Sequence, residues 1–490
     1  MSNYWITLII ASCLALSACA LNSGGEAPTN SLQDIACPDH EIAGDISCHV
    51  LSVLENPDAP EGREIPIRIM VLKATGNSPE SDPLFIIPGG PGQSAIQAPN
   101  LRRFFAEYFA PIRENRDVVL IDQRGVGGSN RLSLEPDAAL LFVRPETNIP
   151  PEWGRAALPR LNAKADLKQY TTERAVDDLD AVRRALNAPH INIYATSYGT
   201  RVAQLYIKRY EQRARAVIMK GVSPPDDNIA LSYGQKPQRT LDLLFAACAS
   251  STRCASAFPD LPAQFASVLE ELAQRPKTIE TEHPMTGAPL QFEITRGAFA
   301  FGIRAQMMNA NALARLPHLI ARAEEGEFSD WAAFLPRLPS VYATQLDGGM
   351  TFSIIAAEDA PRLSEALILA DADGAFVGET LARAFQEVGA FWPRGDAPKD
   401  LFTPLESDVP VLLVSGAFDP ATPPQGAEEM LPGLPNARHI VFPGGSHSAA
   451  NFDGLDLIMA AFIQKGSSTK LDVSAVESNR LPEFQLPEEL

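Results

Sequence analysis

A serine in a tight turn is the first candidate for chemistry in this sequence. The apolar run at residues 191–194 is followed by Ser197, and the small residues Ala195 and Gly199 lie two positions before and after it. A sharp turn from a strand into a helix requires small residues at both places, and it holds the serine hydroxyl clear of the backbone. A helix-like run at residues 200–210 follows. The spacing therefore predicts a nucleophilic serine at a strand-to-helix turn.

A histidine and an aspartate that could activate Ser197 come late in the chain. A serine hydroxyl is a weak nucleophile near neutral pH unless a histidine takes its proton and a carboxylate orients that histidine. Asp419 follows the apolar run at residues 409–414, and His447 follows the run at 438–442. We predict that Ser197, Asp419 and His447 form a catalytic triad.

A glycine-rich segment could supply donors for the oxyanion of such a reaction. Residues 88–92 follow the apolar run at 84–87 and contain three glycines, which allow the backbone to approach a ligand closely. The oxyanion on an attacked carbonyl needs preorganised N–H donors. We expect one from Tyr198, directly after the nucleophile, and the other from Gly90.

The segments that carry these residues alternate between strand-like and helix-like patterns. Strands are predicted at residues 48–54, 64–72, 84–87, 117–121, 191–194, 214–219, 409–414 and 438–442. This alternation indicates an α/β fold with a mainly parallel, doubly wound sheet. The proline-bearing residues 136–167 are predicted to be irregular. Between the two groups of strands the pattern is mostly helical, with helices predicted at 239–248, 263–272, 310–324, 361–371 and 377–388.

This pattern divides the chain into six parts. The helical stretch is interpreted as a cap inserted into a core that resumes after it. The predicted parts are a signal peptide (1–18), a flexible tether (19–36), the first part of the core (37–225), the helical cap (226–404), the second part of the core with the acid and the histidine (405–465), and a C-terminal tail (466–490).

Composition restricts the partners. The 490 residues are 45% hydrophobic and 21% charged, as in globular proteins, and the formal net charge is −19. So acidic a chain is a poor partner for nucleic acid, which is bound through basic surfaces. The sequence does not indicate an oligomeric state.

The first residues predict export. The short apolar run at residues 6–16 ends in a segment, 16–19, that resembles a bacterial lipobox. The resemblance implies cleavage before Cys19 and lipidation of its thiol. Because Ala20 stands where an aspartate commonly marks retention in the inner membrane, we expect a periplasmic protein anchored by lipid to the outer membrane.

The remaining cysteines fit an oxidising compartment. They lie in two close pairs, so two local disulfides are the simplest arrangement: Cys37 with Cys48 and Cys248 with Cys254. No cysteine or histidine spacing is typical of a metal site, and we expect neither a metal nor another cofactor.

Taken together, five motifs resemble the proline iminopeptidase and tripeptidyl aminopeptidase family of α/β-hydrolases; they lie at residues 88–92, 122–125, 197–199, 418–423 and 445–447. The resemblance implies the α/β-hydrolase fold with a helical cap, and cleavage of short peptides from a free amino terminus. It also implies that a cap carboxylate binds the substrate ammonium. Glu358 is the candidate, because it lies where the family often has an acidic pair.

The sequence leaves two other functions open. The same core serves esterases and small-molecule amide hydrolases, because a fold does not determine a substrate. A non-catalytic binding protein of the cell envelope could also keep this fold. The prediction is a serine aminopeptidase that acts through an acyl-enzyme on Ser197.

Overall fold

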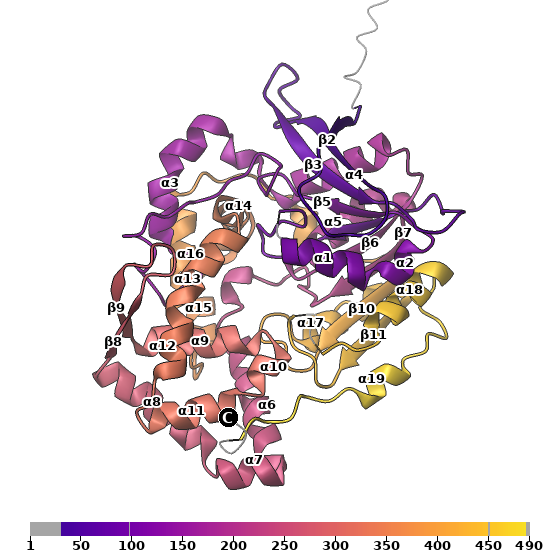
Figure 1. Cartoon of the computed structure of the whole chain (residues 1–490). Coiled ribbons are helices and arrows are strands. Elements are labelled where there is room, and N and C mark those ends of the chain that lie inside the picture. The colour runs from indigo at the N-terminus through magenta and orange to yellow at the C-terminus, as the bar shows by residue number, and fades with distance from the viewer. Residues whose placement is uncertain (1–30, 98, 449–450, 487–490) are drawn as a thin grey trace, which may run out of the picture.

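A nine-stranded sheet forms the centre of the computed structural model, which describes residues 31–97, 99–448 and 451–486 (Figure 1). Its order is β1-β2-β3-β5-β4-β6-β7-β10-β11. The strands are β1 (Gln33–Ile35), β2 (Ile46–Leu54), β3 (Glu64–Leu72), β4 (Leu84–Ile87), β5 (Val118–Ile121), β6 (Ile191–Thr196), β7 (Ala214–Lys220), β10 (Val411–Gly416) and β11 (Ala437–Phe442). The first three pairings are antiparallel and the other five are parallel. This arrangement confirms the predicted fold class.

Helices cover both faces of the sheet, because its central strands are apolar on both sides. Every residue of β4 and β5 is buried. Helices α4 (Thr172–Ala185) and α5 (Tyr198–Tyr210) pack on one face, and α1 (Pro99–Tyr108), α2 (Ala110–Arg113) and α18 (Leu455–Lys465) pack on the other. The parallel strands therefore bring all their carboxyl ends to one edge of the sheet, where the turns after β4, β6, β10 and β11 lie together.

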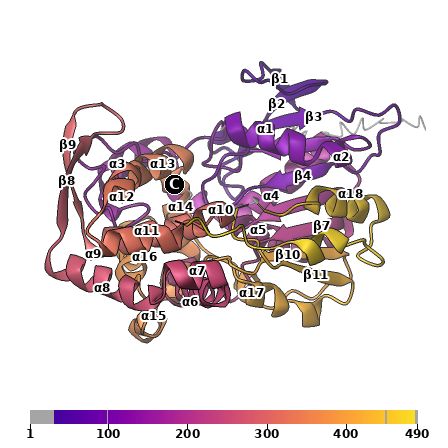
Figure 2. The ribbon, with the colours of Figure 1, turned by 60° about the horizontal axis from the view of Figure 1, so that its bottom comes forward.

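The segment between β7 and β10, here called the cap, covers that edge. Figure 2 shows its elements on one side of the molecule and the sheet on the other. Its α-helices are α6 (Gln235–Ser250), α7 (Thr252–Ala257), α8 (Leu261–Gln274), α9 (Arg296–Met307), α10 (Ala310–Leu313), α11 (Leu316–Glu324), α12 (Ser329–Phe334), α13 (Leu338–Gln345), α14 (Gly348–Ile354), α15 (Glu365–Ala372) and α16 (Thr380–Phe391).

The cap differs from the sequence prediction in two places. The predicted helix at residues 310–324 is two helices, because Pro317 in the first turn of α11 has no N–H to continue a helix from α10. The cap also contains a hairpin of β8 (Lys277–Glu282) and β9 (Pro289–Ile294), which the predominantly helical pattern did not indicate. Outward residues of β8 are polar, so its apolar content is low.

Residues 136–167 were expected to be irregular, but they contain the helix α3 (Pro151–Lys164). Pro151 lies in its first turn, where a missing N–H costs nothing. The helix packs against the cap, since Gly154 lies so close to Phe352 of α14 that a Cβ would stand 2.4 Å from its ring. This second segment therefore enlarges the cap.

Two disulfides close short loops, and the C-terminal tail connects parts of the chain that are distant in sequence. Cys37 is bonded to Cys48 and Cys248 to Cys254, which confirms both predicted pairs. After α19 (Ser474–Ser478) the tail leaves the core and reaches the cap, where the Gln485 N–H donates to the Ala314 carbonyl. Within the described ranges, no helix is both long and apolar enough to span a membrane.

Candidate active site

Ser197 lies in the strained turn between β6 and α5. Its backbone has φ 53° and ψ −125°, a conformation that L residues rarely adopt and that marks functional turns. The turn is possible because its neighbours lack side chains: a Cβ on Gly199 would lie 2.5 Å from the Ile87 carbonyl oxygen, and one on Gly89 would lie 2.8 Å from the Ser197 Cβ. The Ser197 N–H donates to the Lys220 carbonyl of β7, which fixes the turn to the sheet.

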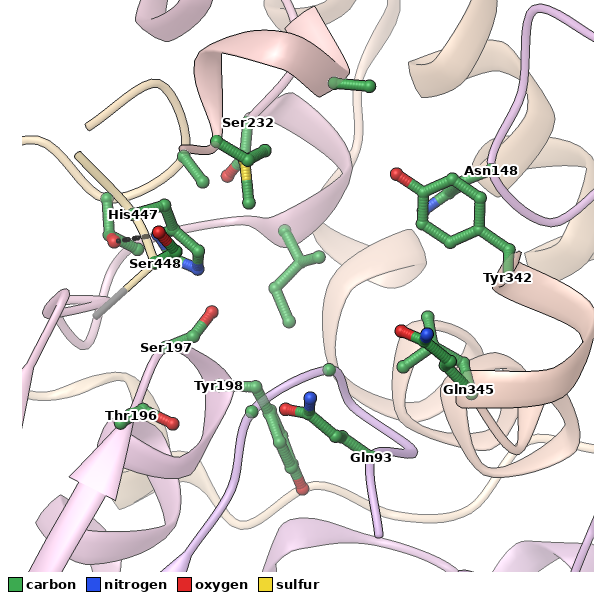
Figure 3. Close-up of a pocket in the computed structure, with 18 of the residues that line it drawn as sticks. Gln93, Asn148, Thr196, Ser197, Tyr198, Ser232, Tyr342, Gln345, His447 and Ser448 are labelled. Atoms are coloured by element: carbon green, nitrogen blue, oxygen red, sulfur yellow. Dashed lines mark hydrogen bonds between the residues drawn. The ribbon is translucent and has the colours of Figure 1, made fainter. Parts of the chain in front are cut away.

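The turn after β11 places His447 beside Ser197, and the turn after β10 places Asp419 against the imidazole of His447. The Asp419 carboxylate accepts from His447 Nδ1, with oxygens at 2.9 and 3.0 Å. Figure 3 shows the Ser197 hydroxyl pointing toward the imidazole of His447. The structure thus brings together the three side chains that are far apart in the sequence.

Asp419 is held as an anion by several donors. It is fully buried, and Oδ1 accepts from the N–H groups of Ala421 and Thr422, both at 2.8 Å, while the Thr422 hydroxyl donates to Oδ2. Burial alone would raise the pKa of Asp419, but His447 and these donors lower it to about 2. A charged carboxylate at this place orients the imidazole and stabilises its protonated form. The role of Thr422 was not predicted; its place three residues after Asp419 was the available signal.

Two N–H groups near Ser197 are free to bind an oxyanion. Within the described chain, neither the Gly90 nor the Tyr198 N–H donates to a protein acceptor. Both residues line the cavity at Ser197. The Tyr198 N–H lies in the first turn of α5, where the helix dipole favours negative charge.

Two buried aspartates hold the glycine-rich turn after β4; one belongs to the motif at residues 122–125, and the other was not predicted. Asp122 accepts from the Ser94 hydroxyl at 2.6 Å and from the Gly128 N–H. Asp347 of the cap accepts from the Gly127 N–H at 2.7 Å, and its own N–H donates to the Gly92 carbonyl. Hydrogen bonds from both the core and the cap therefore hold this turn in place.

A cavity of about 800 Å³ opens above Ser197, between the sheet edge and the cap. Figure 3 shows Tyr342 and Gln345 of α13 across the cavity from Ser197 and His447. Apolar side chains form much of the wall, including Phe104, Phe105, Leu338 and Val341. A cavity of this size accommodates a small ligand.

The structure contradicts the prediction that Glu358 binds a substrate amine. Glu358 does not line the cavity; its side chain is fully buried behind α5. One carboxylate oxygen accepts from the Thr172 N–H at 2.8 Å, and the other accepts from Arg201 at 3.1 Å. Because Glu358 lies outside the cavity and pairs with Thr172 and Arg201 of the core, it stabilises the contact between cap and core.

Asp227 is the carboxylate that faces the cavity among its described lining residues. Burial would raise the pKa of Asp227, but Lys236, at 2.7 Å from Oδ1, and the Ser223 hydroxyl lower it. Asp227 is therefore ionised near neutral pH. Cys19, the predicted lipidation site, lies outside the described residues.

Comparison with known proteins places this geometry in a family. Residues 82–452 match the family model described as the alpha/beta hydrolase fold. The chain belongs to the α/β-hydrolase family. Serine protease Hip1 of Mycobacterium tuberculosis is 25% identical to this α/β-hydrolase over 469 residues, which cover 88% of this chain and 87% of Hip1. The tripeptidyl aminopeptidase of Streptomyces coelicolor is 25% identical over 38% of this chain and 37% of its own.

Among solved structures, the proline iminopeptidase of Mycobacterium smegmatis matches with a TM-score of 0.37 and 16% identity, over 85% of this chain and 98% of its own. The family match and the two peptidase relatives confirm the resemblance seen in the sequence motifs. The chain is therefore a hydrolase, and a serine protease is among its relatives.

Proposed function

We propose that this α/β-hydrolase is a serine exopeptidase that removes short peptides from a free amino terminus through an acyl-enzyme on Ser197. The observation that supports the proposal most strongly is the arrangement of Ser197, His447 and Asp419 at the base of a capped cavity. The residues fit nucleophilic catalysis without any further group.

In the proposed reaction, Ser197 Oγ attacks the scissile carbonyl while His447 Nε2 takes its proton. The N–H groups of Gly90 and Tyr198 stabilise the oxyanion. His447 then gives the proton to the leaving amine, and the C–N bond breaks to leave an ester on Ser197. Water, deprotonated by His447, attacks this ester; the bond from the carbonyl carbon to Ser197 Oγ breaks, Oγ takes the proton back from His447, and the acyl product leaves as a carboxylic acid. Asp419 orients the imidazole throughout and stays ionised.

The cap favours short substrates or chain ends over the middle of a long chain. It covers the edge of the sheet where Ser197 lies, so an extended polypeptide has little room to pass through on both sides. The similarity to a tripeptidyl aminopeptidase supports release from the amino end. Asp227, an ionised carboxylate on the cavity wall, takes the place of Glu358 as the proposed partner of the substrate ammonium.

Three fluorogenic amides test the proposal: Pro-amide, Ala-Ala-Pro-amide with a free amine, and the acetylated tripeptide amide. Cleavage of the free tripeptide but not the acetylated one supports a tripeptidyl aminopeptidase. Cleavage of Pro-amide indicates an iminopeptidase. If all three are inert and a simple ester is hydrolysed, the peptidase proposal fails and the esterase alternative replaces it.

Two variants assign the roles. Ser197→Ala should abolish turnover while the protein stays folded. If the wild type cleaves nothing and no active-site serine probe labels Ser197, the protein is instead a binding protein. Asp227→Asn should raise KM for the free tripeptide about tenfold or more, because it removes the charge that faces the ammonium. An equal effect on the ester would show that Asp227 acts on folding rather than on the amine.

We propose a lipid-anchored form in the cell envelope, supported by the lipobox-like residues 16–19. Labelling with a radioactive fatty acid in a bacterial host should mark the protein. Cys19→Ser should remove the label and release the protein into the soluble periplasmic fraction. A label that persists in this variant would contradict the assignment.

A further inference from the structure

Arg304 of α9 is a buried cation on the wall of the same cavity. Only 5% of its surface is exposed, and it is among the residues that line the cavity. Its guanidinium carbon lies 4.3 Å from the centre of the Tyr233 ring. The Tyr233 hydroxyl accepts from the Asn148 amide at 3.0 Å, so the ring below the guanidinium is fixed in place.

Arg304 has no acceptor in the described part of the chain. No ion pair or hydrogen bond of its guanidinium is present there, and its Nε is buried without a partner. The other buried arginines all donate to carboxylates or carbonyls; they are Arg102, Arg113, Arg116, Arg124, Arg183 and Arg201. Since a buried charge is costly without a partner, Arg304 is arranged unlike the structural arginines of this protein.

The carboxylate on the cavity wall does not neutralise Arg304. Asp227 is engaged by Lys236 and by the Ser223 hydroxyl. Tyr233 contributes only its ring face to Arg304, an attraction that leaves the N–H groups of the guanidinium unused. The cavity therefore presents donors for an anion that comes from outside the chain.

Arg304 lies one helical turn from the loop that carries His447. The Ser448 N–H donates at 2.8 Å to the carbonyl of Met308, the C-cap residue directly after α9. Met308 lies four positions after Arg304, which is about 6 Å along the helix axis. One extended residue spans about 3.5 Å, so an anion at Arg304 lies within a few residues of a bond at Ser197.

We propose that Arg304 binds a carboxylate of the substrate and makes the enzyme selective for acidic short peptides. This inference rests on the proposed peptidase function of the same site. The carboxylate comes either from an Asp or Glu side chain or from the C-terminus of a short peptide. Both present two oxygens that match the planar guanidinium fork.

Calorimetric binding to the full chain with Ser197→Ala tests this without turnover. The first pair is acetyl-Ala-Ala-Ala as acid and as amide, which tests the C-terminal source. The second is acetyl-Ala-Glu-Ala-amide and acetyl-Ala-Gln-Ala-amide, which tests the side-chain source. In at least one pair the acid should bind about 10- to 100-fold more tightly, as expected for a charge-assisted hydrogen bond. Arg304→Gln should bring that ratio close to one, and Arg304→Lys should retain part of it.

The matched control is Arg322→Gln, which removes a cap arginine that pairs with Asp330 and does not line the cavity; it should leave the ratio unchanged. Equal binding within both pairs, no binding of either acid in its acetylated or its free-amine form, or a preference that survives Arg304→Gln would overturn the inference. If Arg304→Gln does not fold, the two pairs and Arg304→Lys still decide. Free-amine versions of the peptides, measured in parallel, test the proposed aminopeptidase function separately, because acetylation affects only the amine.

Discussion

At the scale of single residues, buried charged groups lie near the candidate nucleophile, and they differ in how the protein neutralises them. Asp419 is paired with His447, whereas Arg304 faces the cavity without an acceptor in the described chain. Lys220, at the end of β7, is also buried; its ammonium donates to the His447 carbonyl at 2.7 Å and lies 4.4 Å from the Phe452 ring. Lys220 therefore connects the His447 loop to the sheet, and no carboxylate among the described residues forms an ion pair with it.

Burial of Lys220 predicts a dependence of stability on pH. Burial lowers the pKa of Lys220 from 10.5 to about 8, an effect that Asp419 only partly opposes. Between about pH 8 and 10 the unfolded chain then binds more protons than the folded one, so the contribution of Lys220 to stability rises with pH. The free energy of unfolding of the wild type, relative to Lys220→Met, should rise by about 2–3 kcal/mol from pH 7 to pH 10.

Urea unfolding of both proteins at the two pH values measures this difference. Other groups titrate equally in both proteins and cancel in the comparison. A difference that stays constant with pH would show that the lysine keeps its proton until it unfolds, and would contradict the prediction.

At the scale of elements, the position of Ser197 depends on how closely β4 and α5 approach. Gly199, in the first turn of α5, meets the carbonyl oxygens of Ile87 and Pro88, which end β4 and begin the glycine-rich turn. Both contacts are to main chain, which cannot rotate away. The nucleophile and the proposed oxyanion donors are therefore held by one contact between two elements.

Gly199→Ala tests that contact. In an ordinary helix this change stabilises by about 1 kcal/mol, but here it should destabilise by about 1–3 kcal/mol because the new Cβ lies 2.5 Å from the Ile87 oxygen. A displacement of Ser197 relative to Gly90 should lower kcat about 100-fold. The measurements are urea unfolding and turnover of whichever substrate the enzyme accepts.

The control is Gly287→Ala in the β8–β9 hairpin, where no atom lies within 4 Å of the added Cβ. Gly287 has φ +69°, so this change should cost about 1 kcal/mol and leave kcat unaltered. A stable, fully active Gly199→Ala protein would show that the turn tolerates a wider approach than the structure indicates.

At the scale of the whole molecule, a core and a cap are joined around the cavity. Arg201 of α5 pairs with Asp359 of the cap at 3.0 Å, and Asp347 of the cap pairs with Arg131 of the core at 2.6 Å. The disulfides lie away from this junction, one beside β2 and one between α6 and α7. Neither disulfide joins the core to the cap, so we expect removal of a disulfide to lower stability without a large change in activity.

The prediction concerns the two disulfides. Closing short loops of 11 and 6 residues should each stabilise by about 2–3 kcal/mol. The double variants Cys37→Ala/Cys48→Ala and Cys248→Ala/Cys254→Ala should each lose about that free energy of unfolding, measured in urea, with kcat changed less than about twofold. A large loss of kcat in a variant that remains folded would mean that its disulfide positions the site.

Local sequence was sufficient to predict those features whose physical requirements lie within one short stretch of chain. Small residues around Ser197, turns after apolar strands, and cysteines 6 and 11 residues apart each restrict their own neighbourhood. For this reason eight of the nine strands of the sheet, the disulfides and the three residues of the candidate triad could be named before the fold was known. The strand β1, which lies in the predicted tether, the helix α3 and the β8–β9 hairpin could not be named, since they are short or their apolar patterns are weak.

Long-range packing decided which charged groups face the cavity. Glu358 and Asp227 are both carboxylates in the cap, but α5 places Arg201, 157 residues before Glu358, against it and leaves Asp227 at the wall. The sequence does not distinguish Arg304 from the other arginines of the cap. Its lack of an acceptor in the described chain becomes visible only when its neighbours in space are known. A charge is neutralised by whatever lies beside it in space, and that depends on how the cap and core pack together.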